Sequence, residues 1–181
     1  MRIIAGDWRG RPLVAPEGRG TRPTSDRARE GLFSMLASRA GSFEGLRVAD
    51  LFAGSGALGL EALSRGASYC LFVDSDRDAL AAIRRNADTL GAGSRADVRA
   101  QSVEHSPPPP APCDMLFLDP PYAADLAEMA LARICNPAWV APGGWLSLET
   151  DGGRPPPPVG FAVAAERRFG KAHILLFRRE S

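Results

Sequence analysis

The sequence of 181 residues predicts an α/β fold built on a mostly parallel, seven-stranded sheet with helices on both faces. Short apolar runs with the character of buried strands alternate with longer segments that have the spacing of amphipathic helices. The run 46–51 leads into a glycine-rich stretch and then into a helical segment. The run 69–74 ends in a carboxylate, which is a ligand-facing position in doubly wound folds.

The predicted elements follow one another at short intervals. Ser25 and Asp26 supply N-cap side chains for a helix that runs to about residue 39. Arg27, Arg29 and Glu30 in its first turns fit a surface ion pair. A tight turn joins the last two strands, so they form an antiparallel hairpin and the sheet is mixed at one edge. We expect strands at 46–51, 69–74, 96–102, 114–118, 144–149, 161–167 and 172–177, and further helices at 58–64, 77–90 and 124–134.

A proline run at 107–112 interrupts the alternation of strands and helices. Proline lacks a backbone N–H, so this run fits neither a helix nor an interior strand. We expect a stiff connector that replaces the helix between the third and fourth strands. The alternative is a polyproline II ligand for a partner domain.

Composition narrows the class of protein. The Lys and Arg residues (22) nearly balance the Asp and Glu residues (21), so net charge does not identify a partner. Cys70, Cys113 and Cys135 lie far apart without a histidine at ligand spacing, so we expect no metal and a buried free thiol at Cys70. Because no apolar run has membrane-spanning length and no signal-peptide core is present, we expect a cytoplasmic protein without a membrane partner. We also expect a monomer.

Residues 1–23 form a basic extension ahead of the main domain, 24–181. Two short apolar pairs flank Asp7-Trp8-Arg9-Gly10, and this pattern predicts a small N-terminal β-hairpin. One interpretation is a solvated, loosely packed extension. The other is an RNA-contacting arm, in which guanidinium groups meet phosphates and Trp8 stacks on a base.

Gly54, Gly56 and Gly59 form a Gly-x-Gly-x-x-Gly pattern between the first strand and the next helix. The first two glycines allow a tight turn and the close approach of a ligand, and Gly59 allows the helix to pack closely on the sheet. Alone, the pattern indicates only a nucleotide-like cofactor. Asp74, at the end of the next strand, can accept hydrogen bonds from both hydroxyls of a ribose. Alternatively, Asp74 joins the two aspartates that follow it in capping the next helix.

Asp119-Pro120-Pro121-Tyr122 follows the fourth strand, at the edge of the sheet where the parallel strands end. An exocyclic amine on a base is a poor nucleophile, because its lone pair is delocalised into the ring. The Asp119 carboxylate and the Pro120 carbonyl can accept its two N–H groups and direct the lone pair at an electrophile. Paired prolines fix the backbone, and Tyr122 can stack on a base lifted from its helix. The alternative is an ordinary turn.

The glycine-rich stretch followed by Asp-Pro-Pro-Tyr resembles the class I S-adenosylmethionine-dependent methyltransferases that modify amino groups of bases. The wider pattern is similar to the RsmD family in three stretches, at residues 2–11, 21–33 and 50–66. The resemblance implies a Rossmann-like class I methyltransferase fold and methylation of the N2 amine of one guanine in bacterial 16S ribosomal RNA. It also implies S-adenosyl-L-methionine as the cofactor, S-adenosyl-L-homocysteine as the product, no metal, and 16S RNA within a small-subunit particle as the partner.

The resemblance also assigns roles to individual residues. The target guanine would be held by Asp119, Pro120, Pro121 and Tyr122. The cofactor would be bound by Asp50, Phe52, Ala53, Gly54, Ser55, Gly56, Asp74 and Ser75, with Ser102 and Val103 beside its adenine. The RNA would be contacted by Arg2, Trp8, Arg9, Arg11, Arg22, Arg27 and Lys171.

Three other functions fit parts of the sequence. A DNA or RNA adenine-N6 or cytosine-N4 methyltransferase would use Asp-Pro-Pro-Tyr in the same way, but the basic extension and the lack of a separate DNA-recognition domain favour ribosomal RNA. A nicotinamide-dependent oxidoreductase would use the glycine pattern, but no proton-relay motif accompanies it. An RNA-binding module that has lost its activity would not need the intact motifs.

Overall fold

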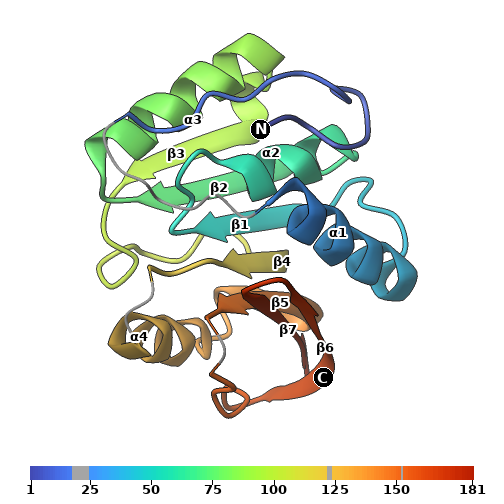
Figure 1. Cartoon of the computed structure of the whole chain (residues 1–181). Coiled ribbons are helices and arrows are strands. Elements are labelled where there is room, and N and C mark those ends of the chain that lie inside the picture. The colour runs from blue at the N-terminus through green and yellow to red at the C-terminus, as the bar shows by residue number, and fades with distance from the viewer. Residues whose placement is uncertain (18–24, 122–123, 152) are drawn as a thin grey trace.

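The computed structural model describes residues 1–17, 25–121, 124–151 and 153–181 of the chain. The seven strands in these residues form one sheet in the order β3-β2-β1-β4-β5-β7-β6 (Figure 1). Strands β1 to β5 are parallel, and β7 is antiparallel to both of its neighbours. The expected α/β class and mixed sheet are therefore confirmed. The strands are β1 (Arg47–Leu51), β2 (Tyr69–Asp74), β3 (Ala96–Ala100), β4 (Cys113–Leu118), β5 (Val140–Thr150), β6 (Phe161–Phe169) and β7 (Ala172–Arg179).

The last strand, β7, lies inside the sheet. It inserts between β5 and β6, so β6 becomes the edge strand. The side chains explain this order, because residues 173–177 of β7 are buried, whereas most of β6 is exposed. An apolar strand is stable where both of its faces are covered, and a strand that carries charged side chains is a suitable edge.

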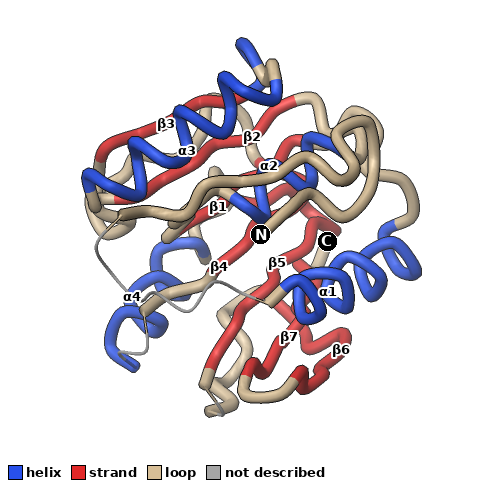
Figure 2. The backbone as a smooth tube through the Cα atoms, turned by 45° about the horizontal axis from the view of Figure 1, so that its top comes forward, coloured by secondary structure: helices blue, strands red, loops and turns tan. Residues whose placement is uncertain are grey.

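Helices cover both faces of the sheet, but unequally (Figures 1 and 2). The buried residues of α1, α2 and α3 belong to one core cluster and those of α4 to another, so three helices pack on one face and α4 on the other. Residues 101–112, between β3 and β4, contain no helix, as the proline run predicts. Within the described residues, no helix has both the length and the apolarity to cross a bilayer. The helices are α1 (Asp26–Ala40), α2 (Ala57–Ser64), α3 (Arg77–Leu90), a short 3-10 turn (Gly93–Arg95) and α4 (Ala124–Ile134).

Two local predictions from the sequence are confirmed. The Ser25 side chain caps α1 by accepting a hydrogen bond from the backbone N–H of Ala28 at 3.1 Å. Cys70 is a buried free thiol, and burial raises its pKa well above the ordinary value. Burial also raises the pKa of the Cys113 thiol, to about 12. Both thiols therefore stay protonated at neutral pH and are poor nucleophiles.

Residues 1–14, here called the N-terminal segment, lie across α2 and α3 (Figure 2). Ile3 and Leu13 are buried in the core cluster that also contains residues of these two helices. The segment turns back on itself through backbone hydrogen bonds from Ile3 N to Arg11 O at 2.9 Å and from Leu13 N to Met1 O at 3.0 Å. The predicted hairpin is therefore present in short form, with one antiparallel β-bridge, between Arg2 and Pro12. The interpretation of this segment as loosely packed is wrong, because its apolar side chains are part of the core.

Buried polar side chains of α2 hold the N-terminal segment. The Glu61 carboxylate is fully buried and accepts hydrogen bonds from the backbone N–H groups of Ile4 at 2.8 Å and Ala5 at 3.0 Å. It also accepts a hydrogen bond from the Arg65 guanidinium at 2.8 Å. The Ser64 hydroxyl donates to the Ala5 carbonyl at 2.6 Å and accepts from the Trp8 backbone N–H at 3.0 Å. Because buried polar groups are costly without partners, α2 depends on this segment.

Candidate active site

The glycine loop (residues 52–56) joins the end of β1 to the start of α2. Its backbone takes left-handed conformations at Phe52, Gly54 and Gly56, with φ angles of 60°, 57° and 76°. Phe52 is the non-glycine residue with positive φ among the described residues, and strain of this kind is concentrated at functional sites. A Cβ atom added at Gly54 would meet nothing within 4 Å, so space in front of the loop is open to a ligand.

Gly59 has the packing role that the sequence predicts. A Cβ atom at this position would lie 2.4 Å from the Phe72 ring and 2.5 Å from the Cys70 sulfur. Real Cβ atoms do not approach other atoms so closely, so only glycine allows α2 to lie this near to β2.

Asp74 connects the end of β2 to the glycine loop. Its Oδ2 accepts a hydrogen bond from the backbone N–H of Gly54 at 2.8 Å, and its Oδ1 accepts one from the backbone N–H of Asp76 at 2.9 Å. Asp76 is the residue that caps α3, through bonds from the N–H groups of Asp78 at 2.9 Å and Ala79 at 3.0 Å. The two aspartates therefore have separate roles, and Asp74 is directed toward the loop rather than toward the helix.

Asp50, on β1, is a buried carboxyl that supports the loop from behind. It is 1% exposed, and its Oδ2 accepts a hydrogen bond from the backbone N–H of Gly59 at 2.9 Å. Burial raises the pKa of Asp50 well above its ordinary value. The hydrogen bond from the Gly59 N–H lowers that pKa, whereas the charges of Asp119 and Asp74 raise it further. Asp74, at the end of β2, and Asp119, just after β4, therefore both lie close enough to influence Asp50.

Asp50→Asn is expected to raise the free energy of unfolding by more at pH 8 than at pH 5. A carboxyl with a raised pKa holds its proton more tightly in the folded protein than in the unfolded chain, where the pKa is about 3.9. Stability is therefore lost as pH rises from that value through the folded pKa. A difference of one between the two pKa values corresponds to about 1.4 kcal/mol. Urea unfolding at both pH values measures the effect, and an equal change at both would contradict it.

Asn86, on α3, fastens the glycine loop to the N-terminal segment. It is 3% exposed, and its Nδ2 donates to the carbonyls of Ser55 and Val14, each at 3.0 Å. Its Oδ1 accepts a hydrogen bond from the backbone N–H of Val14 at 2.9 Å. Sequence reasoning missed this residue. The available signal was its spacing, because Asn86 lies on the same helix face as Ile83 and Leu90, which are core residues.

Asp119-Pro120-Pro121 follows β4 directly beside the glycine loop. The register pairs Leu118 of β4 with Leu51 of β1, so Asp119 and Phe52 are the next residues on adjacent parallel strands. Asp119 is half-buried, Pro120 is buried and Pro121 is exposed. Tyr122 lies outside the described residues. No three His, Cys, Asp or Glu side chains in the described residues are arranged to hold a metal ion.

The remaining residues predicted to bind the cofactor differ in how far they are buried. Ala53 and Ser55 are almost buried within the loop, and Ser75 is exposed after β2. The Ser102 hydroxyl is half-buried and lies 2.8 Å from Nδ1 of His105. Val103 is 2% exposed and packs in the core cluster around α4, and its position beside an adenine stays a prediction.

Trp8 also requires a correction. Its side chain is 9% exposed within the core cluster, and the Arg95 guanidinium lies 4.9 Å from the centre of its ring. Its faces are therefore covered by protein and are not available to stack on a base. The prediction of a surface ion pair for Arg29 is also wrong, because this side chain is buried as well. Arg29 is fully buried and pairs with Asp26 at 2.9 Å, and another bond reaches the Arg2 carbonyl.

The other residues predicted to contact RNA differ in how they are used. Arg11 is exposed, and its Nη2 donates to the Thr89 carbonyl at 2.7 Å, so it also attaches the N-terminal segment to α3. Arg22 lies outside the described residues. The other exposed members of the set are Arg2, Arg9, Arg27 and Lys171.

Comparison with known proteins identifies the class and then the family. A solved structure named "Putative methyltransferase yhhF from Escherichia coli" superposes with a TM-score of 0.87 at 36% identity, over 99% of this chain and 98% of that chain. The protein named Ribosomal RNA small subunit methyltransferase D from Escherichia coli K12 is 36% identical over 100% of this chain and 91% of its own length. The protein of the same name from Haemophilus influenzae is 40% identical, over 98% and 93%.

The strand order and the glycine loop after β1, together with these relatives, define a Rossmann-like methyltransferase. Residues 1–178 match the family model described as "Conserved hypothetical protein 95". The chain belongs to this family, which is the RsmD family that its motifs resemble.

Proposed function

We propose that this protein transfers a methyl group from S-adenosylmethionine to the N2 amine of one guanine in bacterial 16S ribosomal RNA, within a small-subunit particle. The observation that carries the proposal is the position of Asp119-Pro120-Pro121 next to the glycine loop, at the ends of adjacent strands. The similarity to ribosomal RNA small subunit methyltransferases D over nearly the full chain supports the choice of substrate.

The described residues fit this cofactor. The open space in front of Gly54 lets a ligand approach the loop backbone. Asp74 is held at the end of β2 by two backbone N–H groups, in a position suited to ribose hydroxyls. S-adenosylmethionine, when bound, supplies a methyl group made electrophilic by its positively charged sulfur.

The chain itself positions the nucleophile. The Asp119 carboxylate and the Pro120 carbonyl accept the two N–H groups of the guanine amine, so its lone pair points toward the glycine loop. The buried ring of Pro120 limits movement of that carbonyl. Holding the reacting groups in line is the main contribution to the rate. The N–H becomes acidic only after nitrogen has gained its methyl group, so Asp119 acts as an orienting acceptor and not as a strong base.

Mass spectrometry of 16S RNA nucleosides, with and without this protein, tests the proposed reaction. We expect the loss of one N2-methylguanosine when the protein is removed and its return when the protein is restored. Loss of N6-methyladenosine or N4-methylcytidine instead would assign the chain to the other methyltransferase class. Calorimetry supplies the cofactor control, because binding of NAD without binding of S-adenosylmethionine would contradict the proposal.

A further inference from the structure

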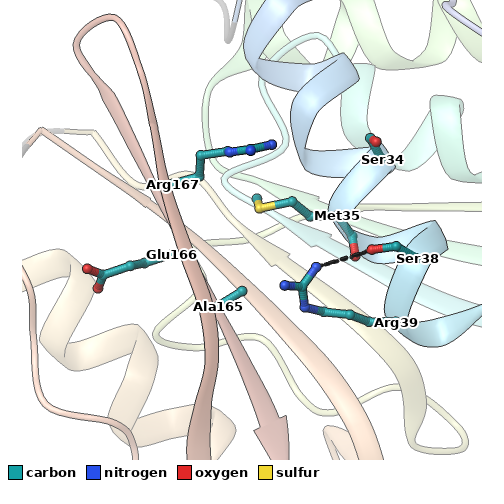
Figure 3. A pocket seen from close by; sticks show the side chains of 7 residues that line it. All are labelled: Ser34, Met35, Ser38, Arg39, Ala165, Glu166 and Arg167. Atoms are coloured by element: carbon teal, nitrogen blue, oxygen red, sulfur yellow. Dashed lines mark hydrogen bonds between the residues drawn. The ribbon is translucent and has the colours of Figure 1, made fainter.

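A groove between α1 and β6 is lined by no residue of the glycine loop. It encloses a volume of about 300 Å³. Met35 and Ala165 form its apolar floor, because both pack against the core. The residues that line it are Ser34, Met35, Ser38 and Arg39 from α1 and Ala165, Glu166 and Arg167 from β6 (Figure 3).

The charge inside the groove is positive. Arg39 approaches from α1 and Arg167 from β6, whereas Glu166 points to the opposite side of its strand (Figure 3). The Glu166 carboxylate is also paired with the Arg154 guanidinium at 3.2 Å. Nη1 of Arg39 donates to the Met35 carbonyl and the Ser38 hydroxyl, each at 3.2 Å, which holds the guanidinium beside the groove. Two cations and two serine hydroxyls therefore line a groove whose one carboxylate is directed elsewhere.

The groove leads toward the candidate active site. His173 of β7 pairs with Thr150, so the β6–β7 turn lies at the edge where the parallel strands end. Phe169, next to that turn, packs against α1, since a Cβ atom at Gly31 would lie 2.1 Å from its ring. Arg27 lies one helical turn before Gly31 on the same side of α1. From Arg27 to Arg39 the helix covers about 18 Å, the rise of about five stacked nucleotides.

We propose that the α1–β6 groove binds the ribose-phosphate backbone of the ribosomal RNA beside the target guanine, an inference that rests on the proposed function. Guanidinium groups pair with phosphate oxygens through two parallel hydrogen bonds, and the Ser34 hydroxyl donates to the same oxygens. The Ser38 hydroxyl donates to the Met35 carbonyl at 2.9 Å and helps to hold Arg39 in place. The apolar floor accepts the face of a ribose. Such contacts fix the register of the RNA and carry no sequence information. Choice of the guanine remains with the residues after β4.

The test compares charge-removing variants of the full chain. The double variant Arg39→Gln and Arg167→Gln replaces each guanidinium with a shorter, neutral amide at an exposed position, so the charge is removed while the fold is retained. For a 16S RNA fragment we expect about tenfold weaker binding. The slope of log K against log salt should fall by about 1 to 2. The KM for RNA should rise while kcat and the affinity for S-adenosylmethionine stay unchanged.

Two controls separate the groove from general charge. Arg84→Gln with Arg85→Gln removes the same charge from the exposed face of α3 and should leave the salt slope unchanged. Arg39→Lys with Arg167→Lys should restore most of the slope, because lysine also neutralises phosphate.

Three results would overturn the inference. The first is a wild-type salt slope in the glutamine variant, and the second is an equal loss of slope in the α3 control. The third is weaker methylation of assembled particles with normal binding of free RNA, which would assign the groove to a protein partner. Each differs from failure of the proposed function, in which the wild-type protein itself would transfer no methyl group to 16S RNA.

Discussion

Asp119→Ala is expected to abolish methyl transfer while S-adenosylmethionine still binds. We expect kcat to fall about a hundredfold to a thousandfold, as when a single aligned hydrogen-bonding group is removed from an active site. The reason is geometric, because Asp119 follows β4 directly and its carboxylate would hold the amine. Cofactor affinity should persist, because Asp74 and Asn86 hold the glycine loop through their own hydrogen bonds. Single-turnover methylation and calorimetry measure the two quantities.

Matched variants identify which property of Asp119 matters. Asp119→Asn keeps one acceptor oxygen and should retain partial activity. Asp151→Ala removes an exposed carboxylate just after β5, on the same edge of the sheet, and should be close to wild type. Full turnover by Asp119→Ala would remove Asp119 from its proposed role. Loss of S-adenosylmethionine binding in this variant would reassign it to the cofactor site.

Glu61→Ala is expected to lower the free energy of unfolding by about 3–5 kcal/mol, the range for removing one partner of a buried, hydrogen-bonded ion pair. The substitution leaves the backbone N–H groups of Ile4 and Ala5 without their acceptor and removes the partner of Arg65. It also withdraws a negative charge that favours the ionised form of the buried Arg29. Urea unfolding at pH 7 measures the loss.

Two control variants accompany Glu61→Ala, one at the same position and one at an exposed glutamate. Glu61→Gln keeps one acceptor oxygen and should lose less stability than the alanine variant. Glu30→Ala removes an exposed carboxylate from α1 and should change stability by less than about 0.5 kcal/mol. Trypsin should cleave after Arg9 faster in Glu61→Ala than in wild type, because the N-terminal segment loses its main attachment. Equal stability of the Glu61→Ala and Glu30→Ala variants would contradict the prediction.

Features that depend on neighbouring residues in the sequence were predictable. The glycine spacing, the carboxylate at the end of β2 and the Ser25 cap are local patterns, and each has its expected geometry. Other features depend on distant partners. Trp8 lies in a stretch whose composition is typical of an exposed turn. In the structure its backbone N–H donates to the Ser64 hydroxyl, and the Arg95 guanidinium lies over its ring. Asn86 is an ordinary helix residue until Val14 and Ser55 are placed beside it. Local spacing carries no information about such contacts.

The attachment of the N-terminal segment has a consequence for synthesis of the chain. Its first residues leave the ribosome earliest, but their partners Glu61 and Asn86 follow 57 and 72 residues later. The segment must therefore wait until α2 and α3 have been made, since no nearer residue supplies these hydrogen bonds. The carbonyl of Ser55 is bonded by Asn86, the same side chain that receives the segment. The N-terminal segment is therefore synthesised first but packs only after α3 has been made. We expect the glycine loop, which Asn86 also holds, to reach its final conformation in the same step.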